Sequence, residues 1–286
     1  MQLAWKIEEG SNVKLKDYDS DYIDEHTDPA IARAELELLG AELGGLQELL
    51  AAAQHHSLLV VLQGMDASGK ADTIFQVLSQ VNPQGCEVLA FKGPTLRELA
   101  HDFLWRVHRG APGRGVIGIF NRSHYEDVLI VRVRNLVPEK AWSQYYAAIN
   151  DFEELLAQND TIIVKFFLHI SNEEQERRLL ARQKDKTDAW KLSAADWAER
   201  RYWDDYQAAY EDALSKCSTD EAPWYIVPAN QKWSRNLLVA RTLVHTLRPY
   251  KDQWLDKLVV RGKQELARIE QIQKAADQKP SRKKSS

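Results

Sequence analysis

The chain alternates short apolar, β-rich runs with longer stretches of helical periodicity. The clearest run is TIIVKFFLHI (161–170), and four others share its character: SLLVVLQ (57–63), CEVLAF (86–91), VIGIFN (116–121) and PWYIVPA (223–229). Helical patterns are predicted over 70–81, 96–109, 139–158 and 232–247. Strands that alternate with helices are typical of a parallel sheet covered on both faces. The pattern therefore predicts an α/β fold with three layers, helix–sheet–helix.

Three segments are expected along the chain. Residues 1–54 form an extension that ends in an Ala/Leu-rich helix from about 29 to 54, residues 55–250 form the core, and residues 251–286 form a C-terminal helix and a basic tail. Inside the core, residues 172–217 replace a short connection with two long polar helices, which we interpret as a lid. The last residues, ADQKPSRKKSS, have the composition of a disordered tail.

Composition narrows the class of protein. With 286 residues and 44% apolar side chains, the chain can fill one large core. We find no run long enough to span a membrane and no signal-peptide pattern in the first ten residues, so we expect a cytoplasmic protein without a membrane partner. Cys86 and Cys217 form no C-x-x-C pair, which argues against a disulfide framework or a zinc site. Because the net charge is −4, an anionic partner requires a local basic patch, and we expect no nucleic-acid partner.

Residues 64–70, GMDASGK, follow a predicted strand and precede a predicted helix, which is the context of a phosphate-binding loop of the Walker A type. Gly64 and Gly69 permit backbone angles that point successive N–H groups at a polyphosphate, with Ala67 and Ser68 between them. Lys70 adds a positive charge at the start of the helix, where the helix dipole is already positive. A chance glycine turn is the alternative, but the motif and its context together favour a nucleotide or phosphate site.

The loop departs from the usual motif at one position. Ala71 stands where most such loops carry the Ser or Thr that binds Mg²⁺. Asp66 and Thr73 are the nearest oxygen donors, and Mg²⁺ accepts carboxylates readily. Asp66 could instead be a turn residue that bonds its own backbone. A carboxylate beside phosphates is repulsive unless a cation lies between them, so we favour Asp66 as a Mg²⁺ ligand.

The segment FNRSHYEDV (120–128) ends the third predicted strand of the core, at the edge where an open α/β sheet binds its ligands. Asn121 stands where such enzymes usually carry a metal-supporting Asp, and Arg122 can clamp a phosphate with two hydrogen bonds. Glu126 and Asp127 supply negative charge one turn later. The alternative is that Asn121 caps a helix whose first turn the two carboxylates stabilise, and both interpretations can hold together. His124 and Tyr125 are more consistent with a structural role.

The lid is the second source of cations. Arg178 and Arg182 are spaced i, i+4 and share one helical face. A run of charges is often only a solvated face, and acidic neighbours such as Asp185 and Asp188 support that alternative. We favour phosphate contacts, because arginines on a helical insertion beside a phosphate loop are how kinases neutralise a transferring group.

These motifs together resemble the polyphosphate kinase family 2, whose members are similar in core fold to thymidylate kinase. The likeness covers nearly the whole chain and is carried by GMDASGKADT, VNPQGCEVLAFKGPT, HDFLWRVHRGAPGRGVIGIFNRSHYEDV, WKLSAADWAERRYWDDYQAAYEDAL and WYIVPANQKWSRN. The resemblance implies reversible, Mg²⁺-dependent phosphoryl transfer between inorganic polyphosphate and an adenine nucleotide.

The resemblance also assigns residues. It implies that Asp66 and Lys70 are the catalytic pair of the loop, that Arg122 contacts phosphates where the two substrates meet, and that the lid arginines line a polyphosphate channel. With Asn at position 121, the sequence resembles the subgroup called class III, whose members accept AMP and ADP. We expect polyphosphate contacts from Lys70, Lys92, Arg122, Arg178 and Arg182, and nucleotide contacts from Asn121, Arg122, Glu126 and Asp127.

Two other functions remain open from the residues alone. An ATP-dependent nucleoside monophosphate kinase would carry a similar loop and a similar arginine, although Ala71 and the large cationic lid argue against it. A nucleotide-binding switch without turnover is the other alternative, against which stand several phosphate-clamping residues at one site. The N-terminal extension suggests a homo-oligomer.

Overall fold

The computed structural model describes residues 3–24, 27–184 and 186–277, and its centre is a six-stranded sheet. The strand order is β1-β6-β5-β2-β4-β3, and every neighbouring pair is parallel except β1 with β6. The strands are β1 (Trp5–Lys6), β2 (Ser57–Gln63), β3 (Cys86–Ala90), β4 (Ile117–Asn121), β5 (Thr161–His169) and β6 (Trp224–Pro228). The predicted parallel sheet of an α/β, three-layer kinase fold is confirmed.

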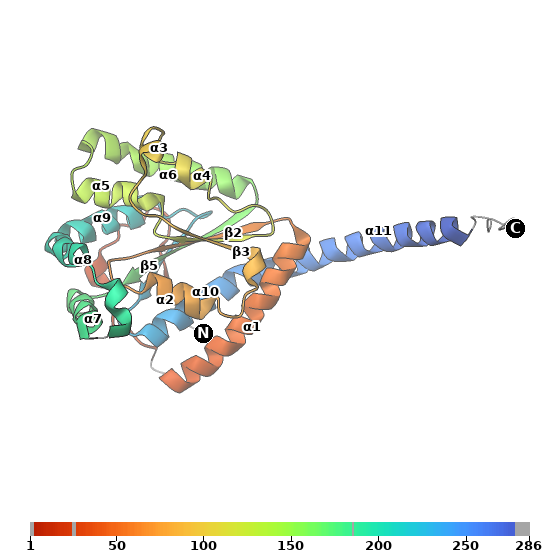
Figure 1. Cartoon of the computed structure of the whole chain (residues 1–286), viewed down its shortest axis with the longest axis horizontal. Coiled ribbons are helices and arrows are strands. Elements are labelled where there is room, and N and C mark those ends of the chain that lie inside the picture. The colour runs from red at the N-terminus through yellow and green to blue at the C-terminus, as the bar shows by residue number, and fades with distance from the viewer. Residues whose placement is uncertain (1–2, 25–26, 185, 278–286) are drawn as a thin grey trace, which may run out of the picture.

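Helices cover both faces of this sheet (Figure 1). One layer holds α1 (Pro29–Ala53), α2 (Lys70–Val77) and α10 (Lys232–Leu247), and the other holds α4 (Trp105–His108), α5 (Ile130–Val133), α6 (Glu139–Gln158) and α9 (Trp203–Lys216). The remaining helices are α3 (Leu96–Leu99), α7 (Asn172–Lys184), α8 (Ala194–Glu199) and α11 (Lys251–Asp277). The described residues also include six 3-10 segments: Leu15–Asp17, Pro83–Gly85, His124–Val128, Lys186–Lys191, Arg200–Tyr202 and Arg248–Tyr250.

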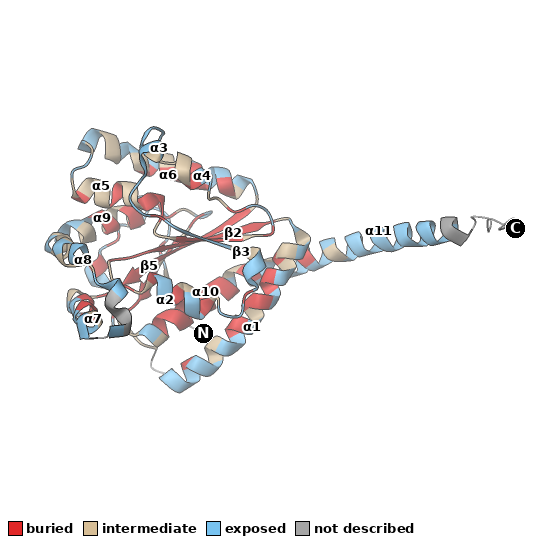
Figure 2. Ribbon diagram, in the orientation of Figure 1, coloured by how far each residue is buried: buried red, intermediate tan, exposed pale blue. Residues whose placement is uncertain are grey.

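The two central strands position the site. Every residue of β2 and β5 is buried, as their continuous apolar runs predict for strands covered on both faces (Figure 2). Leu62 pairs with Asn121 of β4, and Gln63 pairs with Phe167 of β5, so the carboxyl ends of three strands meet at one edge. The phosphate loop and the segment after β4 therefore leave the sheet side by side.

The predicted helix over 96–109 is wrong. Two four-residue helices, α3 and α4, replace it. Thr95 and Glu98 close a reciprocal capping box that starts the first helix. The Asp102 side chain then accepts a hydrogen bond from the N–H of Leu104, an Asx turn that competes with helical bonding and separates the two pieces. The helix predicted over 70–81 likewise ends earlier, at Val77.

The helical insertion, residues 172–217, is more varied than the two polar helices that the sequence predicts. It contains α7, the short α8 and α9, joined by 3-10 turns. Buried residues of α9, among them Tyr210, Ala213 and Leu214, belong to the main hydrophobic core. The last helix of the insertion is thus part of the body, and α7 and α8 lie at one end of it (Figure 1).

The C-terminal helix α11 extends away from the body (Figure 1). Trp254, near its start, is fully buried and donates a hydrogen bond to His56 Nδ1 at 3.0 Å. The tail predicted beyond this helix lies outside the described residues. Across the described ranges, no helix has both the length and the hydropathy needed to cross a bilayer.

Candidate active site

The loop between β2 and α2 has the strained backbone of a phosphate cradle. Its positive φ angles are 151° at Gly64, 62° at Ala67 and 101° at Gly69. A Cβ on Gly64 would lie 2.7 Å from the carbonyl oxygen of Leu168, and a Cβ on Gly69 would lie 1.8 Å from the guanidinium of Arg235. Both glycines are therefore required by conformation and by space.

Lys70 begins α2 and closes the loop from inside. Its Nζ donates to the carbonyl oxygens of Gly64 and Met65 at 2.8 and 3.2 Å. Burial, reinforced by the nearby charge of Arg122, lowers the pKa of Lys70 to about 8, although Asp66 and Glu126 oppose the shift. The lysine is charged at neutral pH, yet it holds its proton much less tightly than an exposed lysine does.

Arg178 supports the loop from outside. Its Nε donates to Glu174, one terminal nitrogen donates to the carbonyls of Ala67 and Ser68, and the other donates to the carbonyls of Ala229 and Asn230. These bonds use all five N–H groups of a guanidinium. Arg178 therefore holds the loop against the start of the helical insertion and has no donor left for a phosphate in this arrangement.

Three further residues fix the loop, and the motif search did not identify them. Gln175 donates to the carbonyl of Asp66, the hydroxyl of Tyr210 accepts from the N–H of Gly64, and buried Arg235 donates to the carbonyl of Ser68. Arg235 also pairs with Asp72. Spacing gave no signal for these contacts, because they join segments more than 100 residues apart.

The end of β4 brings Arg122 to the loop. Arg122 has a positive φ of 63°, a strained conformation for a side-chain-bearing residue. Its guanidinium pairs with Asp66 at 2.6 Å and with Glu126 at 3.4 Å. Burial opposes the charge, but Glu126 and Asp66 outweigh it and raise the pKa of Arg122. Gln63 donates to the same Glu126 at 3.2 Å. The structure thus brings together four predicted residues: Asp66, Lys70, Arg122 and Glu126.

Two local alternatives from the sequence can now be decided. Asn121 does not cap the following helical turn, because the Ser123 side chain accepts the hydrogen bond from the N–H of Tyr125. Thr73 is buried, and its hydroxyl donates to the carbonyl of Gly69 at 3.0 Å. Thr73 is therefore turned into its own helix, whereas Asp66 faces the site.

His124 and Tyr125, which follow Arg122 and Ser123, point into the core. Both donate toward the carboxylate of Glu153 on α6, at 3.1 and 3.0 Å. Lys165 of β5 pairs with the same carboxylate and donates to the Tyr125 hydroxyl and the Cys217 carbonyl. Burial opposes ionisation of Glu153, but Lys165 and His124 keep its pKa below the usual value. This buried network anchors the segment that carries Arg122.

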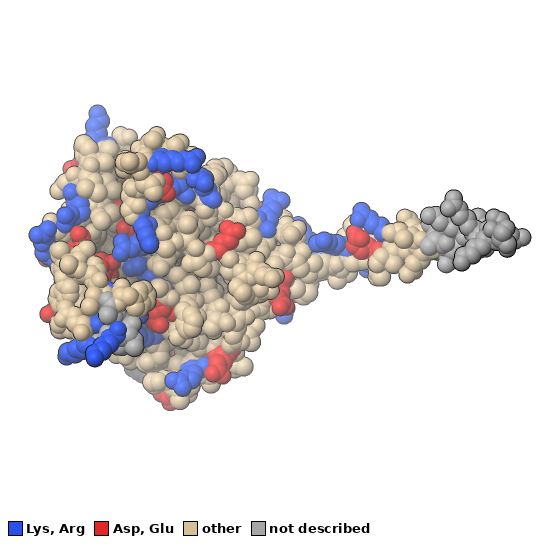
Figure 3. Space-filling model, in the orientation of Figure 1, with Lys and Arg blue, Asp and Glu red and all other residues tan. Residues whose placement is uncertain are grey.

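One cavity, of about 620 Å³, lies between the loop and the helical insertion, and we call it the loop cavity. Most of its polar lining is cationic: Lys70, Arg122, Arg177, Arg178, Arg182, Lys191, Lys232 and Arg235. Asp66, Asp72, Asn121 and Asp196 are its other polar residues. Lys and Arg side chains gather at the end of the molecule where α7 and α8 lie (Figure 3). Because the net charge is negative, binding of an anion was predicted to require a local basic patch, and such a patch is present there.

A larger cavity, of about 1090 Å³, opens on the other side of Arg122, and we call it the strand-end cavity. Apolar and aromatic residues form much of its wall, including Phe91, Phe103, Ile130, Val131, Leu136 and Tyr145. The Phe103 and Tyr145 rings are stacked with centroids 4.3 Å apart. Lys92, which we predicted on the polyphosphate side, lines this cavity instead of the loop cavity.

Asp127 lies at the polar end of the strand-end cavity. Its carboxylate is 3.9 Å from Arg106, and one of its oxygens has no hydrogen-bond partner among the described residues. Burial, together with the charge of Glu126, raises the pKa of Asp127 to about 6, while Arg106 opposes the shift. Arg122 and Glu126 also line this end, so three residues predicted to bind nucleotide share one wall.

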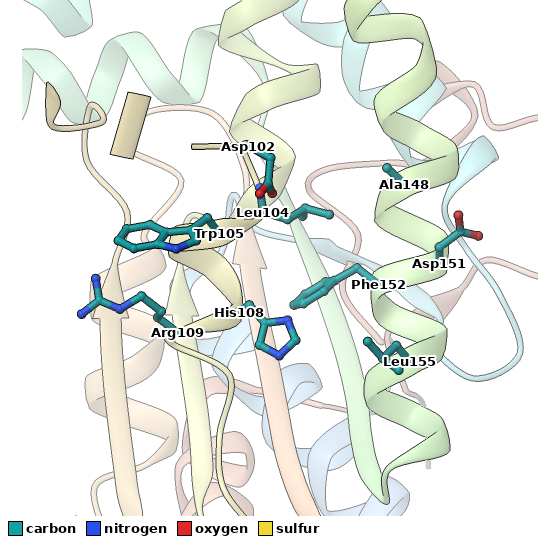
Figure 4. Close-up of a pocket in the computed structure, with 9 residues that line it drawn as sticks. All are labelled: Asp102, Leu104, Trp105, His108, Arg109, Ala148, Asp151, Phe152 and Leu155. Atoms are coloured by element: carbon teal, nitrogen blue, oxygen red, sulfur yellow. The ribbon is translucent and has the colours of Figure 1, made fainter. Parts of the chain in front are cut away.

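A third and more open cavity, of about 560 Å³, lies between α4 and α6 (Figure 4). Asp102 and Ala148 line both it and the strand-end cavity, so it continues that cavity outward. His108 and Phe152 face each other in its middle (Figure 4). The Trp105 ring at its edge is already covered, with His101 stacked on it at 4.0 Å and Arg109 above it at 4.8 Å. We therefore assign no ligand to this cavity.

Comparisons with known proteins agree with one another. The family described as Polyphosphate kinase 2 (PPK2) matches residues 26–254. An AMP/ADP-polyphosphate phosphotransferase of Meiothermus ruber is 48% identical over 244 residues, which cover 85% of this chain and 91% of that protein. An ADP-polyphosphate phosphotransferase of Rhodopseudomonas palustris is 46% identical and covers 81% and 84%. The crystal structure of Polyphosphate Kinase 2 from Arthrobacter aurescens TC1 superposes with a TM-score of 0.83 at 41% identity, over 88% of this chain and 92% of that chain.

Proposed function

Because the chain belongs to the polyphosphate kinase 2 family, we propose that it transfers the terminal phosphoryl group of inorganic polyphosphate to AMP and ADP in a reversible reaction. The observation that carries this proposal is the arrangement of two unlike cavities around one arginine. Arg122 lines both the cationic loop cavity and the largely apolar strand-end cavity. A polyanion suits the first, a nucleotide suits the second, and their reacting phosphates would meet at Arg122.

Polyphosphate is the substrate we assign to the loop cavity. It carries negative charge along its length and offers no apolar surface, so a lining rich in Lys and Arg is the chemistry that recognises it. Lys70 would contact its terminal phosphate, and Arg182 would contact phosphates further along the chain. Arg178 would act indirectly, because its donors hold the loop.

The nucleotide is the substrate we assign to the strand-end cavity. The stacked Phe103 and Tyr145 and the aliphatic wall suit a base and sugar, and the polar end at Arg122 suits the phosphates. Lys92 lines this cavity, so we now propose that it contacts nucleotide phosphates. Asn121, Glu126 and Asp127 remain proposed nucleotide contacts.

In the proposed reaction, a phosphate oxygen of AMP or ADP bonds to the terminal phosphorus of the chain. The bond from that phosphorus to the next bridging oxygen breaks, and the shortened chain leaves with the electron pair. Lys70 and Arg122 would lie beside the transferring group and neutralise its charge. Asp66 holds Arg122 at 2.6 Å, so the arginine is positioned before substrates arrive. No covalent enzyme intermediate is needed.

The residues around the transferring group fit Mg²⁺, the cofactor that the sequence predicts. Asp66 lines the loop cavity with a hard carboxylate donor, and phosphate-bound Mg²⁺ typically takes one or two protein carboxylates. We propose Asp66 as the protein ligand, with substrate phosphate oxygens as the other ligands. When bound, the ion would supply positive charge to the phosphates that react.

The deciding experiment uses AMP and polyphosphate with Mg²⁺ in the absence of any nucleoside triphosphate. We expect ADP and then ATP to form, as followed by chromatography, with the nucleotide total conserved. Product formation only when ATP is added would indicate the nucleoside monophosphate kinase instead. Binding of both substrates without turnover would indicate the switch. Light scattering of the same sample tests the predicted homo-oligomer.

Asn121 is the residue we propose as the determinant of acceptor choice, although it lines the loop cavity. A carboxylate here would repel nearby phosphates, whereas an amide accepts either the AMP or the ADP reaction. We expect Asn121→Asp to change the ratio of kcat/KM for AMP and ADP by at least about tenfold, which equals about 1.4 kcal/mol of differential transition-state binding. Equal losses for both acceptors, with a higher KM for polyphosphate, would instead place Asn121 on the donor side.

A further inference from the structure

One carboxylate stands among the cations of the loop cavity on the side of the helical insertion. Asp196 is in the first turn of α8, where the Ser193 hydroxyl accepts a hydrogen bond from its N–H. Its carboxylate pairs with Arg182 of α7 at 3.1 Å, and about a fifth of each side chain is exposed. Both residues line the cavity. A carboxylate of the protein itself is thus already paired with Arg182.

The charge of Asp196 also acts on the centre of the site. Burial lowers the pKa of Lys70, and Asp196 is one of three carboxylates that oppose this shift. Asp196 acts in the same direction on Arg122. The carboxylate therefore reduces the positive potential that an incoming anion meets both at Arg182 and near the phosphate loop.

We propose that Asp196 is a specificity-determining residue that favours long phosphate chains over short anions in the loop cavity. This inference rests on the proposed function of that cavity. Asp196 holds Arg182 until a polyanion replaces it, and the replacement costs an ion pair and brings two negative charges close together. Only an anion with many other contacts offsets that cost.

Chain length decides how many such contacts exist. A long chain that starts at Lys70 can reach Arg182 and further cations of the loop cavity, such as Arg177, whose side chain is two-thirds exposed. A short anion such as tripolyphosphate has fewer charges to distribute, and orthophosphate has one phosphate. A short anion bound at Lys70 cannot move its charges away from Asp196, whereas a long chain can distribute its phosphates over the other cations and meets less of the repulsion.

The test compares donors of different length on wild type and Asp196→Asn, with AMP as acceptor. We expect the KM for tripolyphosphate to fall about tenfold, because one close contact between like charges is removed. The KM for long-chain polyphosphate should fall less than about threefold. Orthophosphate should become a stronger competitive inhibitor of the donor. The KM for AMP should stay unchanged, because Asp196 does not line the strand-end cavity.

Two variants separate this role from others. Asp204→Asn removes the same charge from the first turn of α9, at an exposed position that does not line the loop cavity, and should shift the donor constants less than twofold. Arg182→Gln should raise the KM for every polyphosphate. If Asp196 only positions Arg182, then Asp196→Asn will raise the donor KM as Arg182→Gln does, and the proposal is overturned.

The outcome is also distinct from failure of the proposed function. Wild type that transfers no phosphate from long-chain polyphosphate to AMP would reject the function itself. If wild type transfers it, but Asp196→Asn changes the KM for tripolyphosphate and the KM for the long chain by the same factor, only the selectivity role is rejected. A larger gain for tripolyphosphate than for the long chain would support it.

Discussion

The two cavities on either side of Arg122 differ in what they can recognise. Eight Lys or Arg residues line the loop cavity, whereas stacked aromatic rings and aliphatic side chains line much of the strand-end cavity. The first depends on charge, and charge interactions weaken in salt and change with protonation. The second offers more apolar contact, which does not change with protonation, although charged residues such as Arg122 and Asp127 line its polar end. The proposed phosphotransfer site thus combines two different kinds of lining.

Within the loop cavity, Arg178 and Arg182 differ in whether a ligand can reach their hydrogen-bond donors. Arg178 and Arg182 share a helical face, but Arg178 is buried with all five donors used, while Arg182 is partly exposed and pairs with Asp196. The number of Lys and Arg residues that line the loop cavity is therefore larger than the number with donors available to phosphate. The following variants test both comparisons.

The largest expected effect is that of Lys70→Met. Removing one preorganised charge at a transferring phosphoryl group typically costs about 10²- to 10³-fold in kcat. Its ammonium group donates to the loop carbonyls of Gly64 and Met65, and Met keeps most of the side-chain volume, so the protein should remain folded by circular dichroism. A folded Lys70→Met protein that keeps more than about a tenth of wild-type kcat would contradict the assignment of this loop.

Arg178→Ala should act mainly on stability. It removes five hydrogen bonds and leaves four backbone carbonyls without that donor, while Glu174 keeps its pair with Arg177. We therefore expect a loss of about 3 kcal/mol in the free energy of unfolding, or roughly 150-fold in the equilibrium constant. Arg182→Ala is the matched control on the same face and should change stability by less than about 0.5 kcal/mol. Chemical denaturation measures both. Similar stability for the two variants would mean that Arg178 is not a structural clamp.

Tyr145→Ala tests the strand-end cavity. Loss of the ring stacked on Phe103 should raise the KM for AMP and ADP about tenfold, from lost stacking and apolar contact. The KM for polyphosphate should stay within about twofold, because Tyr145 does not line the loop cavity. Steady-state kinetics with each substrate varied in turn provides the measurement. Parallel increases in both constants would show that the cavities are not independent.

The smallest effect is on pH dependence. With a pKa of about 8, Lys70 is charged below pH 8 and loses its proton as the pH rises through that value. A polyanion binds the charged form, so its affinity should fall about fourfold between pH 7 and pH 8.5, with proton uptake on binding. Calorimetry in buffers of different ionisation enthalpy measures that uptake. Lys70→Met should show none, and nucleotide affinity should not follow the Lys70 titration.

The sequence by itself determined the frame of this protein. Continuous apolar runs such as 57–63 and 161–170 are typical of strands inside a sheet covered on both faces, and they alternate with helical patterns, so the α/β fold was predicted from local pattern. The glycines and lysine of the loop were identified for a similar reason, because the chemistry of a phosphate cradle is contained in a few consecutive residues. The four residues at the loop and at the end of β4 were predicted one by one.

Only the tertiary structure decided how these residues are supported and which cavity each of them lines. Arg235, Tyr210 and Gln175 reach the loop from more than 100 residues away, and no short motif records such contacts. Lys92 was predicted on one side of Arg122 and lies on the other, because its position depends on how the segment after β3 folds across the sheet edge. The role of Arg178 also depended on tertiary packing. Its helical spacing predicted a face shared with Arg182, but its guanidinium is buried and donates to the loop and to the segment after β6.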